Sequence, residues 1–207
     1  MFRRQHLLVS LSVALFSLVI AGGCSENTQA TPRVTFESSI AKGKHSSTEC
    51  TQSGPWFGIG SFGNPGRGEK PSDDPDNHDL VDPLRPVDDG GEDGQGTASV
   101  SCSVVEATDG FDVILSAQLS GATGGAMTLS GHILRNIDSP GVTMRISRKG
   151  ETYSANANCT MTFNTGIGHG IAAGRVWGIV DCPDAEAPGQ QRICATNAIL
   201  RFENCGQ

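Results

Sequence analysis

Apolar and polar side chains alternate in short runs from Thr97 onward, and this period of two constrains the fold more than any other feature. Two clear runs are Phe111–Leu119 (FDVILSAQL) and Glu151–Phe163 (ETYSANANCTMTF). Successive side chains of a strand point to opposite faces of a sheet, so such runs are typical of strands with one buried face. The apolar positions of the second run are Tyr153, Ala155, Ala157, Cys159, Met161 and Phe163.

Other runs extend this pattern to the C-terminus, with turn residues between them. They are Ala98–Val105, Met127–Ile137, Val142–Ser147, Arg175–Cys182 and Cys194–Glu203. No window of a dozen residues keeps a helical period, and the chain holds 27 glycines. We therefore predict an all-β fold with little helix, an antiparallel β-sandwich of about seven to nine strands.

An earlier stretch, Arg33–Ile40 (RVTFESSI), also has strand-like positions. Cys50 needs a partner and the free ones lie downstream, so we expect this strand to join the same sheet system. The expected organisation is a flexible tether at 24–32 and one domain at 33–207, with a long acidic loop at 64–96. The alternative is a flexible stalk that carries a separate C-terminal domain.

The acidic loop holds most of the negative charge. Between Glu69 and Gly96 ten acidic residues stand against two basic ones, while the formal net charge of the whole chain is -7. This Pro- and Gly-rich composition predicts a solvated connector. A calcium site is the alternative, with the candidate ligands Asp73, Asp74, Asp76, Asp79 and Asp82. No basic patch is present, so nucleic acid is not expected as a partner.

The N-terminus has the pattern of an export signal. Arg3 and Arg4 precede the uncharged run Leu7–Ile20, which is shorter than the roughly twenty residues of a membrane span. The small residues that follow end on Cys24 in the sequence VIAGGC. We assign residues 1–23 to the signal.

In this motif the chain resembles the bacterial lipoproteins, whose lipobox ends in small residues followed by the lipidated cysteine. The resemblance implies that Cys24 becomes the new N-terminus and carries acyl chains that tether the mature protein to a membrane. Ser25 follows Cys24 where aspartate would favour inner-membrane retention, so the outer membrane is the expected location. An ordinary secretory signal with a chance cysteine is the alternative.

Export also bears on the other cysteines, because exported proteins favour disulfides. Six cysteines remain once Cys24 is set aside, and an even set predicts three bridges, with fifteen pairings left open. They are Cys50, Cys102, Cys159, Cys182, Cys194 and Cys205. No C-x-x-C pair occurs, so we expect neither a zinc site nor another cofactor.

One motif suggests a nucleotide and is better explained otherwise. The stretch WFGIGSFG contains Gly58-x-Gly60-x-x-Gly63, the glycine fingerprint of a dinucleotide-binding turn. That fingerprint requires a strand before it and a helix after it, whereas Asn64-Pro65-Gly66 follows here. We expect no nucleotide binding, and we expect the neighbouring aromatic residues to fold onto the domain.

Catalytic signals are weak. The chain has no G-x-S-x-G, H-E-x-x-H or S-x-x-K motif. The histidines with the best claim to a function are His132 and His169, although a surface or turn role is the simpler expectation for both. The scattered acids that could supply a carboxylate pair are Glu106, Asp109, Asp112 and Asp181.

A binding function has clearer candidates in Trp56 and Trp177, because exposed aromatic faces are common in sugar and peptide sites. In GRVWGIV, Val176, Gly178 and Val180 would share one strand face, and Trp177 would lie on the other. If the first set faces the core, Trp177 marks a binding surface. Packing of Trp177 between the sheets is the expectation that we favour, and the binding surface is the alternative.

The C-terminal sequence loosely resembles small cysteine-containing lipoproteins of myxobacteria, on its F-x-N-C ending and the preceding G-R-V-W-G strand. That resemblance implies a cell-envelope location and no activity. We therefore expect a lipid-anchored envelope protein that is a non-catalytic structural or binding module, with a glycan or protein as its partner. The alternative is an envelope hydrolase whose site is assembled from separated loops.

Overall fold

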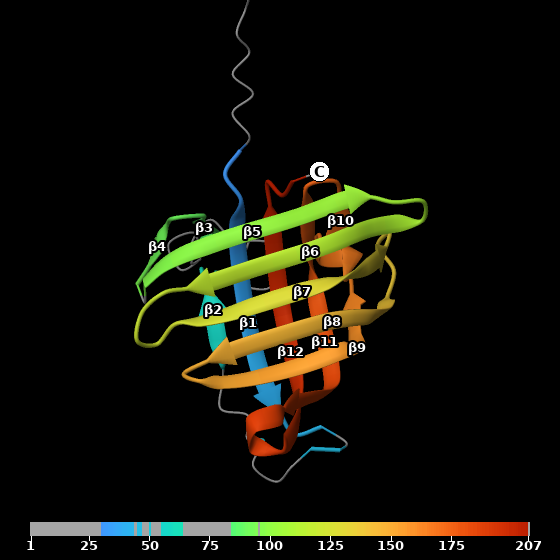
Figure 1. Cartoon of the computed structure of the whole chain (residues 1–207). Coiled ribbons are helices and arrows are strands. Elements are labelled where there is room, and N and C mark those ends of the chain that lie inside the picture. Colours follow the sequence, from blue (N-terminus) through green and yellow to red (C-terminus); the bar gives the residue numbers. More distant parts are fainter. Residues whose placement is uncertain are drawn as a thin grey trace, which may run out of the picture.

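The computed structural model describes residues 30–43, 45–46, 50, 55–63, 84–94 and 96–206. This part of the chain forms twelve strands and two single-turn 3-10 helices (Figure 1). The elements are β1 (Arg33–Ala41), β2 (Phe57–Ile59), β3 (Val87–Asp88), β4 (Glu92–Asp93), β5 (Gly96–Glu106), β6 (Gly110–Leu119), β7 (Gly125–Leu134), β8 (Ser139–Arg148), β9 (Glu151–Thr162), η2 (Thr165–Ile167), β10 (Gly170–Ala172), β11 (Arg175–Ala187), η3 (Pro188–Gln190) and β12 (Arg192–Glu203).

The strands form one antiparallel sheet rather than two. Its order is β2-β1-β12-β11-β9-β8-β7-β6-β5-β4, with β10 added beside β11 and β3 beside β1. In Figure 1 the layer from β5 to β9 crosses steeply over the layer that contains β1, β12 and β11. The all-β prediction is confirmed, whereas the sandwich of two separate sheets is not.

The sheet curls until it is nearly closed, like a barrel. Across the gap, the Val104 amide donates to the Gly206 carbonyl and the Gly206 amide donates to the Cys102 carbonyl, each at 2.9 Å. The curl follows from irregular pairing on both sides of β9, where the register with β8 and with β11 shifts. Such bulges bend a strand and increase its twist.

The predicted alternation fails at one position of β9. Ala157 is exposed and has a φ of 51°, although its sequence neighbours in the pattern, Ala155 and Cys159, are buried. Its amide leaves the ladder and donates to the Thr143 hydroxyl at 2.9 Å. A strict period of two was wrong here because β9 has two more residues than β8 between the pairs Val142–Cys159 and Met144–Ala155.

The other predicted strands are present, and their alternation reflects a continuous core. Phe111, Leu115 and Leu119 on β6 are each at most 2% exposed. The early strand also joins this sheet as expected, since β1 pairs with β12 along its whole length and buries Val34 and Phe36. The short strands β2, β3, β4 and β10 were not predicted.

The last part of the acidic segment contains two short strands, whereas a loop was expected over the whole of 64–96. β3 pairs with β1, and β4 pairs with β5. The Asp93 carboxylate accepts a hydrogen bond from the Gly60 amide at 2.8 Å, and that of Asp89 accepts one from the Val100 amide at 2.8 Å. These acids therefore satisfy backbone donors. The five candidate calcium ligands lie outside the described residues.

The glycine-rich motif forms part of the sheet. Gly58 lies in β2 opposite Glu37 of β1, and Gly60 turns the chain with a φ of 71°. Phe57 is 2% exposed and packs on Phe36 with ring centroids 5.6 Å apart. The motif thus brings an aromatic side chain into the core.

The six described cysteines form three disulfides, as predicted. Cys50 bridges to Cys194, Cys102 to Cys205, and Cys159 to Cys182. The second bridge joins β5 to the C-terminus beside the gap in the sheet, and the third joins β9 to β11 where their register shifts. The bridges lie where the ladder of hydrogen bonds is interrupted.

We predict that the bridges differ in their contribution to stability. In Cys102→Ala/Cys205→Ala the free energy of unfolding should fall by about 4 to 5 kcal/mol, because the bridge restricts a long loop of the unfolded chain. In Cys159→Ala/Cys182→Ala it should fall by about 3 kcal/mol. The sequence separations are 103 and 23. Urea denaturation measures both, and the reverse order would contradict the loop-length argument.

Candidate ligand-binding site

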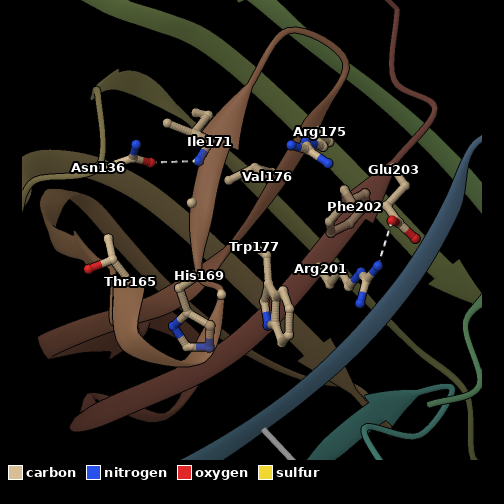
Figure 2. Close-up of a pocket in the computed structure, with 12 residues that line it drawn as sticks. Asn136, Thr165, His169, Ile171, Arg175, Val176, Trp177, Arg201, Phe202 and Glu203 are labelled. Carbon is tan, nitrogen blue, oxygen red and sulfur yellow. Dashed lines mark hydrogen bonds and ion pairs between the residues drawn. The ribbon is translucent and has the colours of Figure 1, made fainter. Parts of the chain in front are cut away.

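A pocket of about 430 Å³ lies where β10, β11 and β12 meet the turn that contains η2 (Figure 2). Its size falls within the range of small-molecule sites. The lining residues are Asn136, Thr165, Gly168, His169, Gly170, Ile171, Arg175, Val176, Trp177, Arg201, Phe202 and Glu203.

Trp177 reaches this pocket because of the alternation in β11. Val176, Gly178 and Val180 are buried, so they face the core and Trp177 lies on the outer face. The glycine is required there, since a Cβ at Gly178 would lie 2.7 Å from Met161 Cε and 2.8 Å from the Thr162 carbonyl oxygen. The favoured expectation that Trp177 packs between two sheets is not met, because the strands form one sheet and Trp177 lies on its outer face.

The indole is nevertheless only half-exposed, because charged and aromatic neighbours flank it. Figure 2 shows Trp177 between His169 and Arg201. The guanidinium carbon of Arg201 lies 4.8 Å from the centroid of the indole, and the His169 ring centroid lies 5.1 Å away at a tilt of 50°. Arg201 occupies this place because it is directly opposite Trp177 in the register of β12 with β11.

Glu203 orients two arginines at the edge of the pocket. Arg201 Nη2 donates to Glu203 Oε1 at 2.7 Å, and Arg33 Nε donates to Glu203 Oε2 at 2.8 Å. The Glu203 side chain is 16% exposed. Burial acts to raise the pKa of this carboxyl, but the hydrogen bonds and charges of Arg201 and Arg33 outweigh it and lower the pKa below its ordinary value.

Arg175 provides a further positive charge at the pocket. It is exposed and lies two residues before Trp177, on the same outer face of β11. Within the described ranges its guanidinium makes no ion pair or side-chain hydrogen bond. It is therefore open to a ligand.

His169 lies in a turn, as the sequence suggested, but it is only 4% exposed. Its Nδ1 accepts a hydrogen bond from the Asn164 amide at 3.4 Å, and its ring packs beside Trp177. The histidine thus supports the wall of the pocket.

We predict that Glu203→Gln destabilises the protein at pH 7, and that this loss of stability becomes smaller as the pH falls below about 4.5. Because the pKa of Glu203 is lowered on folding, its stabilisation is present above about pH 4.5 and is lost as the pH falls through the lowered value. Urea unfolding at a series of pH values from 7 downward measures this change. Glu186→Gln, at an exposed position of β11, is the matched control. An equal loss of stability at pH 7 in both variants would contradict the role of Glu203.

A second cluster brings together His132, Asp109 and Asp112. His132 Nδ1 lies 2.9 Å from Asp112 Oδ1, and Nε2 lies 2.8 Å from Asp109 Oδ1. These hydrogen bonds, that of Asp112 foremost, raise the pKa of His132 above its ordinary value of 6.5. All three side chains are well exposed. Since each ring nitrogen of His132 is hydrogen-bonded to a carboxylate, neither nitrogen can take a proton from a nucleophile.

We expect an NMR titration of His132 to show this pKa directly. Asp112→Asn should lower the pKa more than Asp109→Asn, because the hydrogen bond to Asp112 is the larger contribution. Stabilisation by the charged imidazole should be present below about pH 6.5 and should be lost as the pH rises through the raised value. Glu106→Gln, which alters a neighbouring carboxylate, should leave the titration unchanged. A pKa at or below 6.5 in the unaltered protein would contradict the cluster.

The remaining candidates do not converge on either cluster. Trp56 is partly buried and meets Tyr153 edge-on, with ring centroids 5.5 Å apart. Glu106 pairs with Arg135, and Asp181 accepts a hydrogen bond from Asn197. Trp56 therefore has mainly a packing role in this structure. Of the four candidate acids, Asp109 and Asp112 meet at His132, whereas Glu106 and Asp181 have other partners.

Within the described segments, no group of three or more His, Cys, Asp or Glu side chains is placed to hold a metal ion. No helix in those same segments is both long and apolar enough to cross a membrane.

Sequence reasoning missed Arg201, Glu203 and Arg175 as members of the site. Arg201 and Glu203 flank the core residue Phe202, so the alternation alone predicts that they share the outer face. Their position beside Trp177 depends on the register of β12 with β11, which the sequence did not supply.

The pocket is thus a half-open site with one aromatic wall, two arginines and one carboxylate. Comparisons with protein-family models, with curated proteins and with solved structures found no match to the chain.

Proposed function

We propose that this chain is a lipid-anchored protein of the cell envelope, held at the outer membrane by Cys24, and that its β domain is a non-catalytic structural or binding module. The observation that carries the proposal is the use of every described cysteine in a disulfide. Such bridges persist in oxidising compartments outside the cytosol. The export pattern before Cys24 agrees with that environment.

Among modules, a binding role is better supported than a purely structural one. The pocket beside Trp177 has the volume of a ligand site, and its polar groups come from several strands. Arg201 is already held by Glu203 and by the indole, so little side-chain freedom is lost when a ligand binds.

A hydrolase has weaker support. The one carboxylate that lines this pocket, Glu203, is engaged by two arginines. The exposed histidine cluster has both ring nitrogens of His132 bound to carboxylates. A nucleophile with an adjacent base, which acyl-transfer chemistry requires, is not formed by these groups.

Mass spectrometry of the mature protein from fractionated membranes tests this proposal. We expect an N-terminus at Cys24 with the added mass of a diacylglyceryl group and an N-acyl chain. Reduction should add two hydrogens for each of the three bridges. Cys24→Ser should abolish the lipid mass and leave the bridges intact. Unlipidated chains with free thiols in the cytosol would contradict the proposal.

A further inference from the structure

We propose that the pocket beside Trp177 binds an oxyanion, a carboxylate or phosphate group, on a small polar molecule the size of one or two sugar rings. Arg175 and Arg201 would provide the recognising cations. This inference rests on the proposed binding function and specifies its ligand class.

Charge is the first argument. Arg175, Arg201 and Glu203 line the pocket, and Arg33 joins them through its ion pair with Glu203. Three arginines against one glutamate leave an excess of two positive charges, in a protein whose formal net charge is -7. Such a local excess attracts anions and disfavours cations.

Geometry is the second argument. Arg201 lies opposite Trp177, and Arg175 lies two residues before Trp177, so the two arginines project from neighbouring strands on one face. A guanidinium has five N–H donors in a fixed fork, and Arg201 uses one of them on Glu203. The remaining donors, with those of Arg175, suit the paired oxygens of a carboxylate or phosphate.

The state of the indole separates this ligand class from a neutral sugar. A neutral sugar is commonly held by stacking on a free aromatic face. Here Arg201 covers one face of Trp177 and His169 lies alongside, so the ring is less available for stacking. The pocket therefore selects by charge.

Polar groups for the body of the ligand lie on the other side of the pocket. Asn136 uses its carbonyl oxygen to accept a hydrogen bond from the Ile171 amide at 3.0 Å, which fixes its orientation. Its side-chain amide then remains as a donor, and Thr165 adds a hydroxyl to the same lining. A hydroxylated acid satisfies both ends of the site.

Matched ligand pairs test the inference in isothermal titration calorimetry. Galacturonate is compared with galactose, and glucose 6-phosphate with glucose, all on the disulfide-intact protein. We expect at least one acid to bind about ten- to a hundredfold more tightly than its neutral partner, as charge-assisted hydrogen bonds would produce. The two acids distinguish a carboxylate site from a phosphate site.

Arg175→Gln should weaken binding of that acid about tenfold or more, and Arg175→Lys, which keeps the charge without the fork, should weaken it less. Arg145→Gln is the control, because it removes one exposed arginine from β8, outside this pocket. The affinity of the Arg145→Gln variant for the acid should equal that of the unaltered protein. Thermal unfolding checks that all three variants are folded.

Equal affinity for acid and neutral sugar, no binding of any of the four probes at millimolar concentration, or equal losses in Arg175→Gln and Arg145→Gln would each overturn the inference. A neutral sugar that binds as well as its acid would leave the binding function in place and remove only the ligand class. Mass spectrometry tests the lipid anchor separately, so the presence or absence of the anchor does not depend on the calorimetry.

Discussion

The antiparallel pairing of β1 with β12 is the interaction on which the rest of the structure depends. It brings the first strand of the domain against the last, with Arg33 opposite Glu203 and Ala41 opposite Ala195. The inner faces of these strands supply Val34, Phe36, Leu200 and Phe202 to the core. Without this long-range pairing the layer formed by β1, β12 and β11 would lack its centre, and Cys50 would lie far from Cys194.

The same pairing organises the outer face. Two strands distant in sequence place Arg33 beside Glu203, and β11 then adds Trp177 opposite Arg201. The carboxylate is therefore shielded and shared by two guanidinium groups, which keep it ionised. The stability of the domain and the shape of the pocket thus have a common origin, because one ion-pair network contributes to both.

The curled sheet is closed covalently as well as by hydrogen bonds. The sheet is nearly continuous, but its ends meet through only a few hydrogen bonds near Gly206. The bridge between Cys102 and Cys205 secures this junction, and the bridge between Cys159 and Cys182 secures the bent strand β9. A pocket on the rigid strands of such a domain can keep its arginines in place when it is empty.

The sequence by itself determined the all-β class and the even set of cysteines. It also determined β1 and seven of the strands from Thr97 onward. These follow from local rules, since alternation depends only on which side of a strand each residue faces. The single curled sheet, the disulfide pairing, the exposure of Ala157 and the neighbours of Trp177 were decided only in the tertiary structure. They depend on strand order, register and bulges, which arise from contacts between residues far apart in the chain.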